Sequence, residues 1–158
     1  MPISYSSLGG GGGAFNTLTE ITSSVTNYDT SGISGVAKIT VIGGGGGGGY
    51  SGSPGGNGGN SSVTISGVTT TAQGGEKGEK QYAGEVRAAF SSANGGTGSV
   101  SGSSTSNSGS ASGGEIKIFY QDLTAVSTIN VTIGSGGSAS NYYPAKGFRG
   151  VVLLEYAS

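Results

Sequence analysis

The side chains that most often carry out chemistry in proteins are scarce in this sequence. The chain has no Cys and no His, so a Ser–His–Asp or Cys–His arrangement is impossible and the usual ligands of zinc and iron–sulfur sites are missing. Its 8 acidic residues are scattered, and no two of them form a recognisable acid–base pair. We therefore expect no catalytic residues, no metal site, no cofactor and no enzymatic activity.

Seven consecutive glycines, residues 43–49, invite comparison with a phosphate-binding loop. Such a loop needs Lys and Ser or Thr at fixed offsets before a helix. Tyr50 follows instead, and no helical pattern comes after it. The run is therefore either a mobile linker or an element packed through its backbone alone. The strand pattern just before it favours packing.

Aromatic side chains are the remaining carriers of binding energy, because Tyr and Phe offer a large contact area at low entropic cost. Several lie in predicted loops, and cations in the same stretches can bind phosphate or carboxylate groups. We expect contact through residues 76–94 and 138–149, with Arg149 as a further cation. The candidate contact residues are Tyr82, Arg87, Phe90, Tyr142, Tyr143 and Lys146. The alternative is that the rings cover the edge of the core and that the cations are plain solvated charges.

The composition suits one domain with a small core. The 158 residues include 36 Gly, with 32% hydrophobic and 9% charged residues, far from the average of about 7% Gly and 25% charged. A net charge of −1 provides no basic field for nucleic acid. No apolar run reaches the length of a membrane span, and the N-terminus lacks a signal-peptide pattern. We therefore expect no membrane insertion.

Short runs of β-branched and apolar residues predict a mainly β fold, a small β-sandwich-like domain with long glycine-rich loops. Ala37, Ile39 and Val41 should face the core. The runs 115–120 and 127–133 read as a hairpin, and the continuous apolar run near the C-terminus reads as a strand buried on both faces. Residues 74–80 read as a solvated loop. The predicted strands cover residues 36–42, 62–68, 115–120, 127–133 and 148–156.

Residues 1–30 read as an N-terminal attachment or oligomerisation segment, and residues 31–158 as a glycine-rich β tip domain. Phe15, Leu18, Ile21 and Val25 are spaced as on a helical face. Intervening Ser and Thr weaken a helix, so a short strand fits nearly as well.

Three phrases in one order resemble the glycine-rich tail proteins of bacteriophages, which include receptor-binding adhesins of tail-fibre tips. The phrases are Ile39-Thr40-Val41-Ile42 before the glycine run, Val131-Thr132-Ile133-Gly134-Ser135-Gly136-Gly137, and Gly150-Val151-Val152-Leu153-Leu154-Glu155-Tyr156. The resemblance implies glycine runs in three-residue-per-turn helices of the polyproline II type. It also implies a homotrimer in the virion, at the tail fibre or tail tip, assembled in the host cytoplasm with other tail proteins.

The function that this resemblance implies is binding to the host bacterial surface, at an outer-membrane protein or a surface glycan. Because residues 76–112 lack long glycine tracts, we do not expect one chain to form a full layer of glycine helices, and glycines from several chains are one solution. One alternative is a structural virion protein, for capsid decoration or tail assembly, that meets only other virion proteins. A second is an ice-binding protein, although such a fold is expected to carry a regular Gly-x-x repeat.

Overall fold

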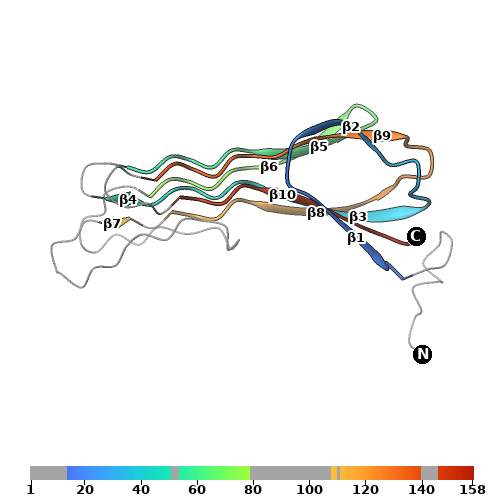
Figure 1. The fold of residues 1–158 in the computed structure, drawn as a ribbon, viewed down its shortest axis with the longest axis horizontal. Helices are drawn as coiled ribbons and strands as arrows, with labels where there is room; N and C mark the ends of the chain where they lie inside the picture. The colour runs from blue at the N-terminus through green and yellow to red at the C-terminus, as the bar shows by residue number, and fades with distance from the viewer. Residues whose placement is uncertain (1–13, 51–53, 79–107, 110, 140–145) are drawn as a thin grey trace.

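The computed structural model describes residues 14–50, 54–78, 108–109, 111–139 and 146–158, and these residues contain no helix. They form two antiparallel four-stranded sheets and one two-stranded ribbon (Figure 1). The first sheet has the order β1 (Thr17–Ile21), β10 (Val151–Tyr156), β3 (Val36–Ile42), β8 (Ile116–Asp122). The second has the order β2 (Val25–Asp29), β9 (Thr128–Thr132), β5 (Ser61–Ile65), β6 (Val68–Ala72). The ribbon pairs β4 (Gly49–Tyr50) with β7 (Ser108–Gly109).

The core lies between the two four-stranded sheets, where β3 and β10 pack against β5. Alternating β-branched residues form it, because every second side chain of a strand points to the same face. Ala37, Ile39 and Val41 are fully buried, which confirms the predicted inner face of β3. The other large buried apolar side chains of the described residues are Ile21, Ile33, Val63, Ile65, Leu123, Ile129, Val131, Val152 and Leu154.

The predicted hairpin between residues 115–120 and 127–133 is wrong. β8 pairs with β3 in the first sheet, whereas β9 pairs with β2 and β5 in the second. The connection between them carries Leu123, which is fully buried and donates its backbone N–H to the Gly35 carbonyl oxygen at 2.9 Å. The buried Leu123 side chain therefore anchors the connection in the core, where the chain crosses from the first sheet to the second.

The stretch from Phe15 to Val25 forms strands, so the strand alternative was the correct one. β1 and β2 are edge strands of the two sheets, joined by residues 22–24. The C-terminal strand β10 lies between β1 and β3, with Val152 and Leu154 fully buried. Val151 and Leu153 on its other face are only half-buried, so the predicted burial on both faces holds for the inner face alone.

Three pairs of extended segments run out of the sandwich and back (Figure 1). Residues 43–49, 73–78 and 134–139 leave from the ends of β3, β6 and β9. Residues 54–60, 111–115 and 146–150 return into β5, β8 and β10. Ser158 lies at the opposite end of the sandwich, where its N–H donates to Asn16 Oδ1 at 2.9 Å.

Candidate functional site: the glycine-segment array

The glycine-segment array consists of residues 43–49, 54–60, 73–78, 111–115, 134–139 and 146–150. Residues 43–49 form its centre, and all seven glycines are buried. Their backbone N–H groups donate to three different segments in turn, so that glycines three residues apart donate to the same segment. The donor–acceptor pairs are Gly43 to Glu115 (3.0 Å), Gly46 to Ser112 (3.0 Å), Gly44 to Gly59 (2.9 Å), Gly47 to Gly56 (2.8 Å) and Gly45 to Phe148 (2.8 Å).

The carbonyl groups of the central segment repeat with the same period. Gly44 and Gly47 accept from Gly75 (2.7 Å) and Gly78 (2.9 Å) of residues 73–78, and Gly45 accepts from Gly137 (2.8 Å). All five other segments therefore bond directly to the centre. A recurrence every three residues, with bonds to neighbours rather than within the segment, is the periodicity of a polyproline II helix.

Residues 73–78 show how the outer segments satisfy their backbone. Gly75 and Gly78 donate inward, as described above, while the other four N–H groups donate to side chains of two flanking segments. These bonds are Gly74 to Asn60 Oδ1 (2.9 Å), Lys77 to Asn57 Oδ1 (2.9 Å), Gln73 to Glu115 Oε2 (2.9 Å) and Glu76 to Ser112 Oγ (2.7 Å). Every N–H of this segment thus has an acceptor, which a buried extended backbone requires.

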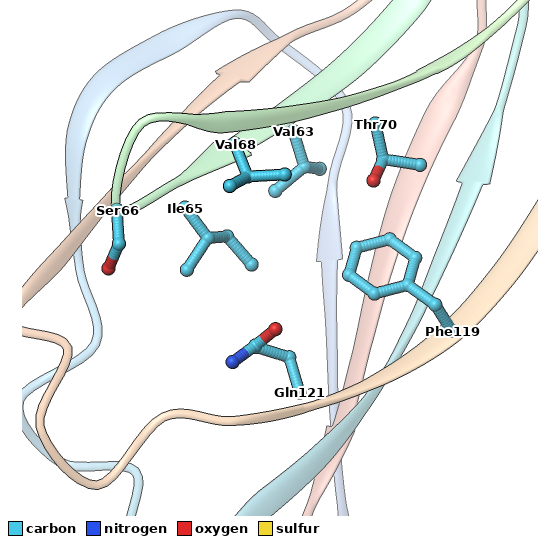
Figure 2. A pocket seen from close by; sticks show the side chains of 7 residues that line it. All are labelled: Val63, Ile65, Ser66, Val68, Thr70, Phe119 and Gln121. Carbon is cyan, nitrogen blue, oxygen red and sulfur yellow. The ribbon is translucent and has the colours of Figure 1, made fainter.

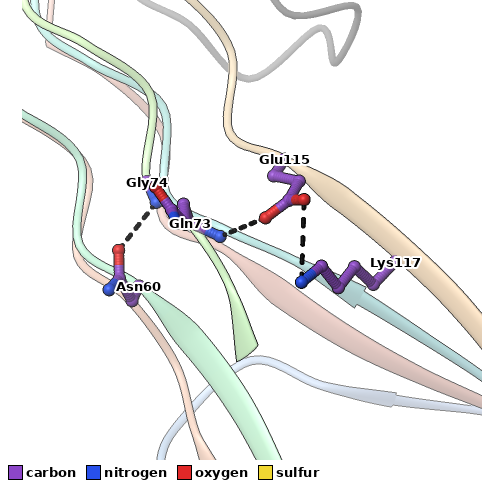
Figure 3. Close-up of polar contacts among 5 residues, drawn as sticks. All are labelled: Asn60, Gln73, Gly74, Glu115 and Lys117. Atoms are coloured by element: carbon purple, nitrogen blue, oxygen red, sulfur yellow. Dashed lines mark hydrogen bonds and ion pairs between the residues drawn. The ribbon is translucent and has the colours of Figure 1, made fainter. Parts of the chain in front are cut away.

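Glu115 fastens the junction between sheet and array (Figure 3). Its N–H donates to the Gln73 carbonyl oxygen at 2.8 Å, and its carboxylate accepts from Gln73 as described. Lys117 Nζ lies 3.7 Å from the other carboxylate oxygen. The Glu115 carboxylate therefore connects Lys117 of β8 with Gln73, the residue that follows β6. This contact lies where the paired strands end and the array begins.

Glycine is required in the array by close approach of neighbouring backbones. A Cβ built at Gly46 would fall on the Glu76 carbonyl oxygen, and one at Gly47 on that of Ser138. Likewise, a Cβ at Gly58 would fall on the Gly44 oxygen. Only a residue without a side chain permits these contacts.

Two expectations from the sequence are corrected here. A single chain supplies all six segments, so the array does not need glycines from several chains. Within the predicted solvated loop 74–80, Gly75 and Gly78 are buried against the centre. Some positions of this outer segment accept side chains, as Gln73, Glu76 and Lys77 show, although a Cβ at Gly74 or at Gly75 would meet neighbouring backbone.

The outgoing segments run away from the sheets, and the returning segments run back toward them (Figure 1). Of the predicted contact residues, Lys146 is described: it is exposed and begins the last returning segment. Arg149 and Phe148 on the same segment are also exposed, Phe148 by 70%. Tyr82, Arg87, Phe90, Tyr142 and Tyr143 lie outside the described residues.

Sequence reasoning missed the acceptor side chains of Asn57, Asn60, Ser112 and Glu115. A signal for the first two exists, because residues 55–60 read Gly-Gly-Asn-Gly-Gly-Asn and place an amide at every third position. Ser112 and Glu115 also differ by three, although nothing in their local sequence marks them as acceptors.

An open apolar pocket of about 210 Å³ lies between the β5–β6 hairpin and β8 (Figure 2). It is lined by Val63, Ile65, Ser66, Val68, Thr70, Phe119 and Gln121. None of these side chains ionises at ordinary pH, so the pocket offers no acid–base group. It is a gap at the open edge of the sandwich, remote from the array.

Two carboxyl groups in the described part of the chain have shifted pKa values, and both belong to turns. The Ser31 hydroxyl and N–H lower the pKa of Asp29, with the N–H at 2.9 Å. The Thr124 N–H (2.9 Å) and hydroxyl (2.7 Å) lower the pKa of Asp122. Both are side chain-to-backbone turns two residues long. Within the described ranges, no group of three or more potential metal ligands comes together.

Comparisons with protein-family models, curated proteins and solved structures found no match to this chain. In the described part of the chain, no helix is present that is long and apolar enough to span a membrane.

Proposed function

We propose that this chain is a bacteriophage tail-fibre or tail-tip protein that binds the host bacterial surface without catalysis. The observation that carries the proposal is the common far end of the array. The three outgoing segments all run away from the sheets toward this end, opposite Ser158 and the β1 end of the sandwich. Such an arrangement suits a protein held at one end and making contact at the other.

The array supports this proposal because it is a stiff spacer. Its segments are tied together by backbone bonds of 2.7–3.1 Å, and its interior contains almost no side chains that could change rotamer. We take the six segments to be polyglycine-type helices of three residues per turn. Rigid scaffolds that present variable connections are a common way to build a binding surface.

The sheet end of the molecule supports contact with other virion proteins or further copies of this chain. On the outer face of the first sheet, Ile116 (43%), Ile118 (56%) and Tyr120 (63%) are exposed in a row along β8, while Leu18 (63%) on β1 is separated from them by β10 and β3. Clustered apolar exposure of this kind marks protein contact surfaces. A homotrimer assembled through this face is part of the proposal.

A cell-binding experiment tests the proposal. Purified, labelled full-length chain is mixed with a panel of bacterial strains, and bound protein is measured after washing. Saturable binding to some strains and not others is expected. A protein that serves only capsid decoration or tail assembly would bind none of them and would instead bind purified virion parts through the apolar face of β8.

A further inference from the structure

The last returning segment, residues 146–150, carries two cations that form no ion pair within the described part of the chain. Lys146 and Arg149 are both exposed, and neither makes an ion pair or hydrogen bond with a described residue. By contrast, Lys38 lies 2.8 Å from Glu155 and Lys117 lies 3.7 Å from Glu115.

The period of the segment places the two cations on one side. Gly147 and Gly150 both donate to residues 134–139, at Gly137 (3.0 Å) and Gly134 (2.8 Å), so residues three apart share a face. The same period aligns Lys146 with Arg149, with about 9 Å between their backbone positions at 3.1 Å per residue.

The two described segments that bond to this segment carry no acidic residue that could compensate the two positive charges. Residues 134–139 contain only Gly, Ser and Ala, and the central segment contains only Gly. Phe148, between the two cations, exposes 70% of its surface. Cations of this kind attract phosphate or carboxylate groups, and an aromatic face attracts the polarised C–H groups of a sugar ring.

We infer that residues 146–149 bind an anionic surface glycan, one that carries phosphate or carboxylate groups, through Lys146 and Arg149 with Phe148 against a sugar ring. This inference rests on the proposed function and names the class of receptor. The binding is partly electrostatic, so it weakens as salt is raised from 50 to 500 mM.

The probe is the delipidated polysaccharide of a strain that binds the protein, used intact, after phosphate removal, and after carboxyl reduction. Binding to the full-length chain is measured by calorimetry. The intact polysaccharide should bind, and at least one of the two treatments should abolish binding. Lys146→Gln with Arg149→Gln should weaken binding about tenfold or more. The charge-preserving pair K146R and R149K should retain it.

Two matched controls separate this site from general effects. Lys117→Gln removes an exposed cation elsewhere and should leave binding unchanged. Phe148→Ala should weaken binding several-fold, whereas Val68→Ala, which truncates a side chain that is 72% exposed on the second sheet, should not. Unchanged thermal unfolding of each variant shows that the fold is intact.

The inference is overturned if the polysaccharide fails to bind, if both treatments leave binding intact, or if the glutamine pair binds as well as the wild type. Strain binding that is lost when the cells are treated with protease, but survives removal of both anionic groups, would also overturn it. In that case the proposed function stands with a protein receptor. The proposed function itself would be refuted by a different result, namely failure of the wild-type chain to bind any strain.

Discussion

The backbone N–H of Gly75 donates to the carbonyl oxygen of Gly44 at 2.7 Å, and the same bond recurs three residues later between Gly78 and Gly47 at 2.9 Å. These residues are separated by the whole of the β5–β6 hairpin in the sequence. These bonds therefore hold residues 43–49 and residues 73–78 together in one array.

Adding one methyl group inside the array should be strongly destabilising. In Gly46→Ala the new Cβ meets the Glu76 carbonyl oxygen, which is backbone and cannot move aside cheaply. We expect the free energy of unfolding in denaturant to fall by about 3 kcal/mol or more. Gly32→Ala is the matched control, because nothing lies within 4 Å of its Cβ. Equal stability of the two variants would mean that residues 43–49 are a linker.

Removing an acceptor from the Gly-Gly-Asn repeat should cost less. Asn60→Ala leaves the Gly74 N–H without its acceptor at 2.9 Å, and a lost hydrogen bond of this kind is worth about 1 kcal/mol. Asn60→Asp keeps an acceptor oxygen and should be closer to wild type. The comparison is made by denaturant unfolding of the three proteins. If alanine and aspartate behave alike, the side-chain oxygen does not hold the segment.

Acid should weaken the fold through the two turn aspartates. Both pKa values are lowered from 3.8 in the native state. A lowered native pKa gives stability that is present above the unfolded value and is lost as the pH falls through the native value. In Asp29→Asn with Asp122→Asn the acceptor oxygens remain but do not titrate. The melting temperature of this variant should therefore fall less than that of the wild type between pH 5 and pH 2.5. Parallel curves would contradict this.

Association through the outer face of the first sheet should be sensitive to charge. Ile118→Asp places a carboxylate among the exposed apolar side chains of β8 and should shift the proposed trimer to monomer in sedimentation experiments. Val68→Asp, at a side chain that is 72% exposed on the second sheet, is the control and should not. A wild-type chain that sediments as a monomer at all concentrations would contradict the proposed trimer.

Five strand positions were predictable from this sequence, while the pairing of the strands was not, and β6 was missed because the predicted strand 62–68 is interrupted by a turn at residues 66–67. Alternation of Ala37, Ile39 and Val41 with polar or half-buried neighbours identifies the inner face of β3, because one face of the strand packs on the core. Pairing depends on which way the connection turns, and Leu123 has no local pattern that reveals its burial. A hairpin was therefore predicted where the chain crosses between sheets.

The central segment of the array was predictable from the sequence, but the outer segments were not. Seven glycines in a row stand out, but outer segments need glycine only where they face a neighbour. Residues 73–78 place Gly75 and Gly78 inward and expose Gln73 and Glu76, so they resemble a charged loop in sequence. The requirement for Gly at such positions comes from a partner segment far along the chain. The contact residues predicted at 82, 87, 90, 142 and 143 remain predictions.

Host binding is tested most directly by comparing the adsorption to cells of the wild-type chain with that of a variant carrying Tyr142→Ala and Tyr143→Ala. The protein is proposed to bind the host at the far end of the array, and in the sequence residues 140–145 lie between segments 134–139 and 146–150. The wild-type chain should show saturable, strain-specific binding, and the double variant should lose it while its melting temperature and sedimentation stay unchanged. Equal binding by both proteins would contradict this site, and absence of wild-type binding to every strain would contradict the proposed function.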